Sequence, residues 1–261
     1  MNWKRWGVII TLLFLFWLWQ QWPDGKLHVI FCDVGQGDAS VVVLGSFQAL
    51  IDTGPSKEKL FNCLGKEMPF WDREIDLVFI SHPQTDHNGA LVGLKERYKI
   101  DKVVEMVERK DMYRYKDLYF DILNGGNNEI IDEKFGENTN ISENEDSAVI
   151  YLRYFDFSVL YTGDIGEKTE LALLEEGVLK KTSVLKVPHH GSKFSSSISF
   201  LLHLKPILAV VSVGAKNSYG HPNSDTLMRL EWVRAKTLRT DLSGNIEVII
   251  GGEKLQVFTD R

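Results

Sequence analysis

Two histidines and one aspartate occur close together in a single segment, Ile80–Ala90. The segment follows the apolar run Ile75–Ile80, which predicts a buried strand that ends at the first histidine. Neutral imidazole nitrogens and carboxylate oxygens are ligands that zinc, manganese and iron accept in proteins. His82, Asp86 and His87 therefore indicate a metal site at a strand end, although alone they could also be ordinary surface residues.

Three later segments repeat this arrangement. In each, an apolar run that predicts a strand is followed by a carboxylate or an imidazole. The segments are Val159–Asp164, Val184–Ser192 and Ala209–Pro222. The repetition makes a chance origin of the first segment much less plausible, and it predicts one site built from several strand ends.

Six motifs in this order resemble the metallo-β-lactamase superfamily, and within it the hydrolase domain of ComEC-type competence proteins. The motifs are Asp33–Ala39, Asp52–Gly54, His82–His87, Thr162–Asp164, His189–Ser192 and Asn217–Pro222. The resemblance runs from about Leu27 to the C-terminus. It implies an α+β fold of the αββα sandwich type, in which two mixed β-sheets pack face to face with helices outside.

The resemblance also implies metal ligands. It places His82 at a first metal position and Asp86 and His87 at a second, with Asp164 bridging both. Such a centre activates a water molecule for attack on phosphorus. We expect one or two divalent ions, zinc or manganese.

The adjacent His189 and His190 share the remaining roles. One of them completes the second metal position, and we favour His189 as that ligand, although sequence alone does not separate adjacent imidazoles. His190 and Asp86 are then expected to act in catalysis, with His190 in substrate binding or proton transfer. The residues expected to bind substrate are Ser192, Lys193, Asn217 and His221.

One position departs from the superfamily pattern His-x-His-x-Asp-His, because Gln84 stands where the second histidine belongs. The interval between His87 and Asp164 contains no histidine, and Asn144 is the nearest candidate to replace it. We therefore expect a weak or empty first position. Asp52 is expected either to cap a turn or to orient a metal-binding histidine.

The elements that must hold these side chains are predicted from hydrophobic periodicity. Three consecutive strands with short turns, 27–34, 39–44 and 47–51, predict an antiparallel start. Further strands are predicted at 75–80, 103–107, 147–154, 157–161, 236–240, 246–250 and 255–258, and helices at 56–68, 90–98 and 167–176. The polar segment 110–144 is expected to hold a hairpin and an exposed loop. We expect one hydrolase domain, residues 27–261.

Residues 1–22 carry Lys4 and Arg5 and then an uncharged, tryptophan-rich stretch from Trp6 to Trp22. This stretch is about the minimum that crosses a hydrocarbon core of roughly 30 Å. The preceding positive charges predict a single transmembrane helix with the domain outside the cytoplasmic membrane. A cleaved signal peptide is the main alternative, but no small-residue cleavage site follows.

Charge and cysteine content narrow the function only slightly. The net charge of −6 excludes a general attraction for polyanions. However, the segment between Gly177 and Ser224 contains no acidic residue, and its lysines could attract phosphate. Cys32 and Cys63 lack metal-binding spacing, and we favour buried free thiols over a disulfide.

The leading hypothesis is a membrane-anchored, metal-dependent phosphodiesterase that acts as a DNase. The resemblance to the competence-type branch implies that such an enzyme degrades one DNA strand during uptake. The chain has no long hydrophobic channel region, so uptake would need a separate channel protein as partner. Hydrolysis of another extracytoplasmic phosphodiester, such as a wall polymer or phospholipid head group, is the second reading. A degenerate, non-catalytic binding module is the third.

Overall fold

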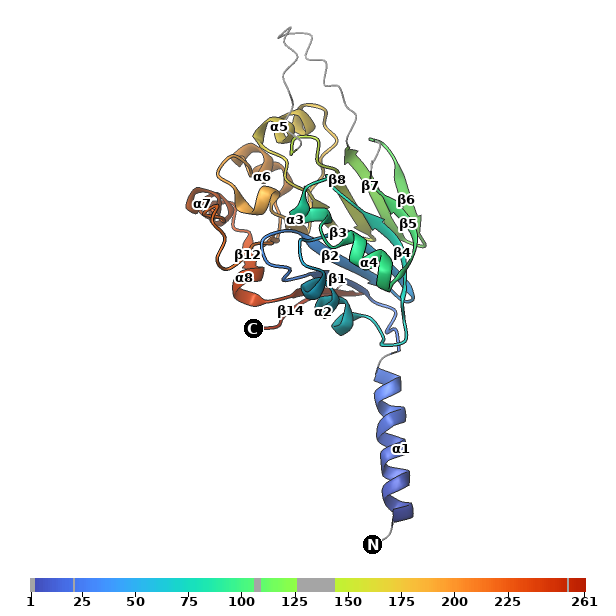
Figure 1. Cartoon of the computed structure of the whole chain (residues 1–261). Helices are drawn as coiled ribbons and strands as arrows, with labels where there is room; N and C mark the ends of the chain where they lie inside the picture. Colours follow the sequence, from blue (N-terminus) through green and yellow to red (C-terminus); the bar gives the residue numbers. More distant parts are fainter. Residues whose placement is uncertain (1–2, 21, 106–108, 126–143, 253) are drawn as a thin grey trace.

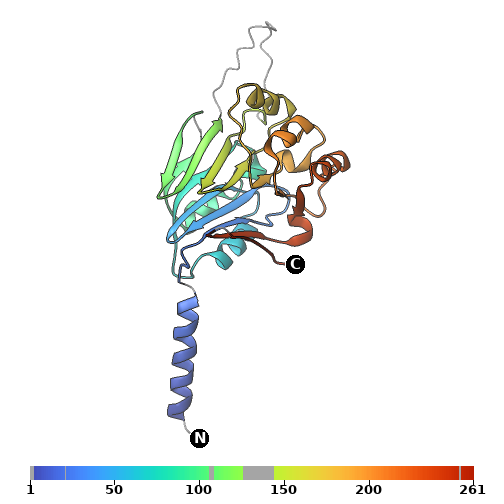
Figure 2. The ribbon, with the colours of Figure 1, turned by 180° about the vertical axis from the view of Figure 1, so that it is seen from behind.

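Two β-sheets packed face to face, with helices on both outer sides, form the body of the molecule (Figures 1 and 2). The computed structural model describes residues 3–20, 22–105, 109–125, 144–252 and 254–261. Within these residues each sheet has seven strands, and parallel and antiparallel neighbours occur in both. The αββα class expected from the sequence is confirmed.

The first sheet begins with three antiparallel strands, as the short turns predicted. The third, fourth and fifth strands in chain order are parallel to one another. In spatial order the strands are β14 (Lys254–Thr259), β13 (Ile246–Gly251), β1 (Leu27–Phe31), β2 (Ala39–Leu44), β3 (Phe47–Thr53), β4 (Glu74–Phe79) and β5 (Lys99–Val104).

In the second sheet the last four strands in chain order are parallel to one another, and the remaining neighbours are antiparallel. In spatial order the strands are β12 (Lys236–Arg239), β11 (Leu208–Val211), β10 (Val184–Lys186), β9 (Phe157–Tyr161), β8 (Val149–Tyr154), β7 (Leu118–Asn124) and β6 (Met112–Tyr115). Strands β6 and β7 form the hairpin expected in segment 110–144. Residues 126–143 of this segment lie outside the described part of the chain.

The core has three layers, because each sheet buries both of its faces. Between the sheets, Phe79 of the first packs against Phe120 of the second, and Phe31 packs against Tyr161. Outside the first sheet pack α2 (Lys57–Glu67), α3 (Thr85–Asn88) and α4 (Leu91–Arg97). Outside the second pack α5 (Glu167–Glu175), α6 (Ile198–Leu204) and α7 (Ser224–Trp232), while the short α8 (Thr240–Ser243) follows β12.

The predicted element positions agree with the structure to within a few residues at most places. The prediction was wrong at 103–107, where the strand β5 begins and ends earlier. Lys99, Asp101 and Lys102 make the first part of this strand polar. The hydrophobic pattern therefore marked only its last residues, although the backbone pairs with β4 from Glu74 onward.

The segment predicted to cross a membrane forms α1 (Trp3–Gln20), which extends away from the body (Figure 1). Among the residues that the structure describes, no helix is both long enough and apolar enough to cross a membrane. The predicted transmembrane anchor is therefore not supported.

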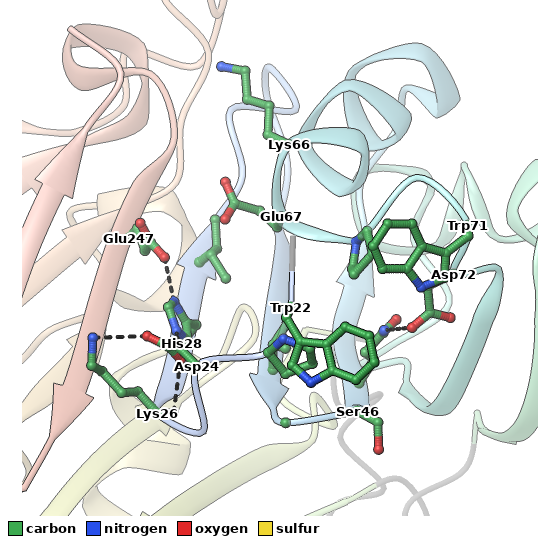
Figure 3. A pocket seen from close by; sticks show the side chains of 16 residues that line it. Trp22, Asp24, Lys26, His28, Ser46, Lys66, Glu67, Trp71, Asp72 and Glu247 are labelled. Atoms are coloured by element: carbon green, nitrogen blue, oxygen red, sulfur yellow. Dashed lines mark hydrogen bonds and ion pairs between the residues drawn. The ribbon is translucent and has the colours of Figure 1, made fainter. Parts of the chain in front are cut away.

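A cavity of about 640 Å³ lies on the outer face of the first sheet, between the C-terminal end of α2 and the start of β1 (Figure 3). His28 lies between two carboxylates there, 2.9 Å from Asp24 and 2.7 Å from Glu247. Burial raises the pKa of the nearby Glu67 to about 7, and the Glu247 carboxylate adds to this rise. None of the side chains predicted to bind metal lines this cavity.

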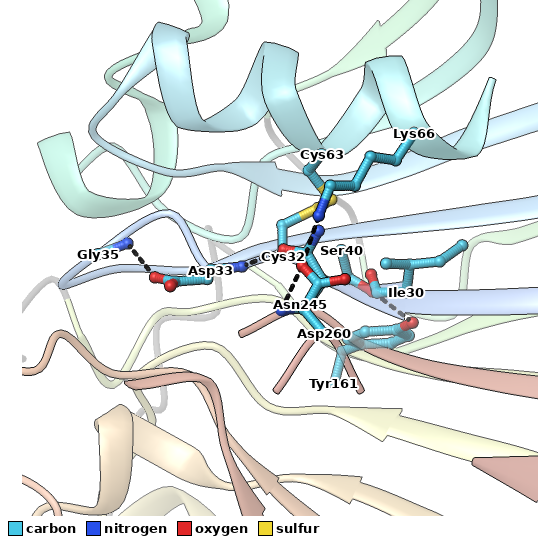
Figure 4. Close-up of a disulfide and its surroundings, with 10 residues drawn as sticks. All are labelled: Ile30, Cys32, Asp33, Gly35, Ser40, Cys63, Lys66, Tyr161, Asn245 and Asp260. Atoms are coloured by element: carbon cyan, nitrogen blue, oxygen red, sulfur yellow. Dashed lines mark hydrogen bonds and ion pairs between the residues drawn. A yellow bond between two sulfur atoms is a disulfide. The ribbon is translucent and has the colours of Figure 1, made fainter. Parts of the chain in front are cut away.

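Cys32 and Cys63 form a disulfide that joins the segment after β1 to α2 (Figure 4). The expectation of buried free thiols was therefore wrong. Both cysteines are buried in the layer where α2 packs on the first sheet, and their Cα atoms lie 5.8 Å apart. This packing, which brings together residues 31 positions apart, could not be read from their spacing in the sequence.

Candidate metal centre

The side chains singled out from the sequence gather at one edge of the sandwich, where parallel strands of both sheets end. Asp52 is the second-last residue of β3, and His82 follows β4. Asp164 follows β9, and His190 follows β10 in the 3₁₀ turn Pro188–Gly191. Loops at the carboxyl ends of parallel strands are where open α/β sheets place their ligand sites.

Four side chains at this edge form a compact group. Asp86, His87, Asp164 and His190 each offer one nitrogen or oxygen atom, and these atoms all lie within 4.8 Å of one another. Nε2 of His87 and Oδ1 of Asp164 are buried and have no hydrogen-bond partner among the described residues. Two imidazoles and two carboxylates with unsatisfied buried atoms fit a divalent cation such as zinc or manganese.

A carboxylate fixes the orientation of His87. Asp52 Oδ2 lies 2.8 Å from His87 Nδ1, and the backbone N–H of Ser81 donates to Asp52 Oδ1 at 2.7 Å. The Nδ1 atom is thereby satisfied, and Nε2 is left to face Asp164 Oδ1 at 3.3 Å. Asp52 has the orienting role that the sequence had left open beside turn capping.

His190 is oriented by the backbone. Its Nδ1 lies 2.9 Å from the carbonyl oxygen of Ser212, just beyond β11. Its Nε2 lies 3.3 Å from Asp86 Oδ2 and 3.5 Å from Asp164 Oδ2. His189 instead remains about one-third exposed, and its Nε2 lies 3.8 Å from Asp164. The group therefore contains His190, which was expected to act in catalysis. It does not contain His189, which was expected to be the ligand.

The turn that presents these histidines is strained. His189 and His190 both have left-handed backbone conformations, with φ of 48° and 52°. Residues other than glycine pay for this conformation in free energy, and such residues collect at functional sites. Because two successive side chains are turned this way, the ring of His190 points into the sandwich while that of His189 stays nearer the surface.

The pKa values within the group reflect its close packing of charges. Burial alone would lower the pKa of His87, but the carboxylates of Asp164 and Asp52 outweigh burial and raise it well above its ordinary value. Burial would raise the pKa of Asp164, yet His190 and His87 hold it well below its ordinary value. The group is therefore stabilised by attraction between its own histidines and carboxylates, and a cation would have to displace protons from the histidines.

Lys186 was missed from the sequence. Its side chain is buried beneath the group, where Nζ forms an ion pair with Asp38 Oδ2, donates to the Gly163 carbonyl at 3.3 Å and lies 3.9 Å from Asp164 Oδ1. Burial would lower the pKa of Lys186, but Asp38 and Asp164 raise it above its ordinary value. The signal in the sequence was a single lysine inside the apolar run Val184–Val187.

Known proteins confirm the family. The model of the metallo-beta-lactamase superfamily matches residues 32–214. The chain belongs to this superfamily. It is 28% identical to ComE operon protein 3 of Bacillus subtilis over 92% of its own length and 27% identical to competence protein ComA of Neisseria gonorrhoeae over 98%. The chain spans only 35% and 38% of the lengths of these relatives. The resemblance to the competence-type branch is thus confirmed.

The fold is also found in a solved structure of the superfamily. The metallo-beta-lactamase fold protein YhfI from Bacillus subtilis superposes with a TM-score of 0.53 at 10% identity, over 85% of this chain and 99% of that one. At this identity the likeness establishes the fold of the superfamily and nothing about substrate.

The first metal position of the superfamily is altered in this chain. His82 lies at the site, with Nδ1 3.0 Å from Ser81 Oγ, and its buried Nε2 has no hydrogen-bond partner among the described residues. Gln84, in place of the second histidine, donates from Nε2 to Asn144 Oδ1. The side-chain amides of Gln84 and Asn144, which were the candidates for the altered position, are therefore hydrogen-bonded to each other. His82 is not a member of the compact group of four.

Two of the four residues expected to bind substrate have structural roles instead. Ser192 is buried, and its Oγ accepts the Phe194 N–H. Asn217 Nδ2 donates to the carbonyls of Gly214 and His221, and its Oδ1 accepts two backbone N–H groups. Both side chains are thus engaged in holding loops, so neither is free to contact a substrate in this conformation.

The other two lie where a substrate can reach them. Lys193 is exposed, and its Nζ lies 4.7 Å from the centre of the Phe194 ring. The ring of His221 lies 5.7 Å from that of His189, beside the group. Both side chains are therefore free to contact a ligand, and their expected role in substrate binding stays a prediction.

Proposed function

We propose that this chain is a metal-dependent phosphodiesterase that hydrolyses single-stranded DNA. The observation that carries the proposal is the compact group Asp86, His87, Asp164 and His190, in which His87 Nε2 and Asp164 Oδ1 are buried without a hydrogen-bond partner among the described residues. This set of nitrogen and oxygen atoms fits a divalent cation. When bound there, the cation supplies an activated water and stabilises negative charge on the phosphoryl oxygens. His190 replaces His189 as the proposed ligand.

The basic surroundings of the group favour a phosphodiester over an uncharged substrate. The segment between Gly177 and Ser224 contains six lysines and no acidic residue, although the chain as a whole is acidic. Lys186 is buried and the other five are exposed. Lys193 and Lys216 follow β10 and β11, on the side of the group, whereas Lys180, Lys181 and Lys205 precede these strands, at their opposite ends. Such a local excess of positive charge attracts a phosphate backbone.

The protein's own residues have distinct tasks in this mechanism. Asp52 and the Ser212 carbonyl hold the Nδ1 atoms of the two histidines, so that both Nε2 atoms face the group. Lys186 offsets part of the negative charge of Asp38 and Asp164. His189 and His221, at the exposed side, are placed to bind a phosphoryl oxygen or to give a proton to the leaving alkoxide.

We further propose that the protein acts outside the cytoplasm. The disulfide between Cys32 and Cys63 supports this location, because disulfides persist in oxidising compartments and are rare in the cytoplasm. The competence proteins among the relatives support a role in DNA uptake, in which a separate channel protein would be the partner.

The test is cleavage of a labelled single-stranded oligonucleotide by the purified chain with added Mn²⁺ or Zn²⁺. Asp164→Ala and His87→Ala are the inactive variants, and Lys205→Ala, a surface change on the basic segment, is the matched control. We expect cleavage by the wild type and the control and at least a 100-fold loss in both inactive variants, of the order seen when catalytic groups are removed.

A second candidate is a binding module without catalytic activity, favoured by the Gln84–Asn144 amide pair at the first metal position. Turnover of bis(p-nitrophenyl) phosphate separates the two. A protein that binds Mn²⁺ but hydrolyses neither this ester nor DNA would support the module and contradict our proposal. Hydrolysis of the ester without cleavage of DNA would point to a different phosphodiester.

A further inference from the structure

Tyr219 is an exposed aromatic residue beside the metal centre. Its side chain is 71% exposed, although aromatic rings usually gain stability from burial. The ring stacks on that of His221, with centroids 6.0 Å apart and planes inclined by 16°. One face of the tyrosine is therefore occupied by an imidazole of the site, and the rest of the ring is presented to solvent.

The loop that carries Tyr219 is held firmly. Asn217 Oδ1 accepts the backbone N–H groups of Tyr219 at 3.2 Å and His221 at 3.0 Å, and its amide nitrogen binds two carbonyls. The Asn223 N–H donates to the Gly191 carbonyl at 2.9 Å, which ties the loop to the turn that carries His190. The backbone beneath the exposed ring is thus held in place before any ligand arrives, which reduces the entropy lost on binding.

A short path of side chains connects this ring to the metal centre. The rings of His221 and His189 are 5.7 Å apart, and His189 Nε2 lies 3.8 Å from Asp164 Oδ2. A polymer whose phosphate lies at the group would therefore have its neighbouring units close to Tyr219. A small phosphate ester would not need to reach it.

The charge around the ring favours an anionic polymer. Tyr219 lies in the acid-free segment between Gly177 and Ser224, and Lys216 is exposed in the same loop. Elsewhere in this acid-free segment, Lys193 lies over the ring of Phe194, a second exposed aromatic residue with 69% of its surface exposed. Exposed aromatic rings among lysines are the pattern by which proteins bind single-stranded nucleic acid, with bases stacked on the rings and cations along the backbone.

We propose that Tyr219 stacks on a nucleobase of a single DNA strand whose phosphate is held at the metal centre. This inference rests on the proposed phosphodiesterase function and adds recognition of bases to it. Because any base has a flat face, the contact would favour unpaired strands without selecting a sequence.

Binding separates this inference from catalysis. The full chain with Mn²⁺ present is titrated into fluorescent oligo(dT) and into an oligonucleotide of equal length made of abasic sites, both with phosphorothioate linkages that slow cleavage, and anisotropy is followed. Both ligands carry the same phosphates, so their affinity ratio isolates the bases. Stacking predicts that the wild type prefers oligo(dT) by about tenfold or more.

Four variants assign the preference to the ring. Tyr219→Ala and Tyr219→Leu should bring the affinity ratio close to one, while Tyr219→Phe should keep it. Phe155→Ala removes a ring that is 73% exposed in the turn between β8 and β9, at the opposite end of β9 from Asp164, and should change nothing. Wild-type protein that binds both oligonucleotides equally, or a ratio that survives in Tyr219→Ala, would overturn the inference.

Catalysis then gives a second readout. With Mn²⁺, Tyr219→Ala should raise the KM for oligo(dT) by about tenfold, the same factor as in binding, and leave the KM for the abasic oligonucleotide within about twofold. Equal loss on both substrates would mean that the substitution damages the loop, and the stacking role would be rejected. If the wild type cleaves nothing but retains a Tyr219-dependent preference for bases, the proposed enzyme fails while base recognition stands.

Discussion

Asp52 Oδ2 lies 2.8 Å from Nδ1 of His87, and this contact decides which imidazole nitrogen faces Asp164. The carboxylate is itself held by both the backbone N–H and the hydroxyl of Ser81. The orientation of His87, a central member of the group, therefore depends on Asp52 and on the residue that holds Asp52 in place.

Replacing Asp52 by asparagine should weaken metal binding without removing a ligand. The amide keeps the size of the side chain but loses the negative charge that supports His87. Loss of such supporting groups costs about 10- to 100-fold in metal affinity. Isothermal titration with Zn²⁺ or Mn²⁺ measures it, and Asp33→Asn, at another strand end of the first sheet, is the control. Unchanged affinity in Asp52→Asn would contradict the orienting role.

The two adjacent histidines should respond differently to substitution. His190→Ala removes a buried member of the group, so the bound metal should fall sharply in a direct assay by plasma emission spectroscopy. His189→Ala removes a partly exposed ring, so the metal should remain while turnover falls by about 10- to 1,000-fold, in the range for loss of an acid–base group. The reverse result would restore His189 as the ligand.

Reduction of the disulfide should destabilise the fold. The bond between Cys32 and Cys63 closes a loop over a sequence separation of 31 residues, which stabilises a folded state by about 3.7 kcal/mol. Guanidinium unfolding with and without a phosphine reductant measures this difference. The double variant Cys32→Ser/Cys63→Ser should match the reduced wild type and be insensitive to the reductant. A midpoint that reductant leaves unchanged in the wild type would contradict the prediction.

Glu67 should make stability depend on pH in a defined direction. Burial, followed by repulsion from Glu247, raises its pKa from 4.5 to about 7. The folded state then binds a proton more tightly than the unfolded state, so the contribution of Glu67 to stability falls as the pH rises through this interval. Glu67→Gln should remove that loss.

The measurement compares the free energies of unfolding of Glu67→Gln and the wild type at pH 5 and pH 8. The variant should gain about 2 kcal/mol relative to the wild type on going to the higher pH, somewhat less than the full shift because the side chain is partly solvated. Glu58→Gln, at an exposed position of the same helix, controls for the loss of one carboxylate. An equal difference at both pH values would exclude Glu67 as the cause.

The strand ends of the site could be predicted from the sequence because each apolar run is followed directly by a polar ligand-type residue. Asp164 and the pair His189 and His190 lie where these runs indicated. Which of the two histidines turns inward could not be predicted, since it follows from two successive left-handed residues. Sequence patterns carry little information on such local strain.

Other features depend on contacts between distant residues. The ion pair of Lys186 with Asp38 joins β10 to the turn before β2, and the disulfide joins the segment after β1 to a helix. Asn217 was expected to bind substrate because it lies in a motif, but its side chain is used within its own loop. Motifs thus indicated where the site lies, and packing decided what each residue does there.

The group is assembled from both sheets. The Asp52 carboxylate supports His87, and the Ser212 carbonyl supports His190. During synthesis from the N-terminus, a ribosome must therefore add residue 212 before the last of these supports exists. Until then the two halves of the centre cannot meet in their final geometry. A chain that ends before residue 212 would carry all four members of the group and still lack the support of His190, so the group is not organised until the sandwich has closed.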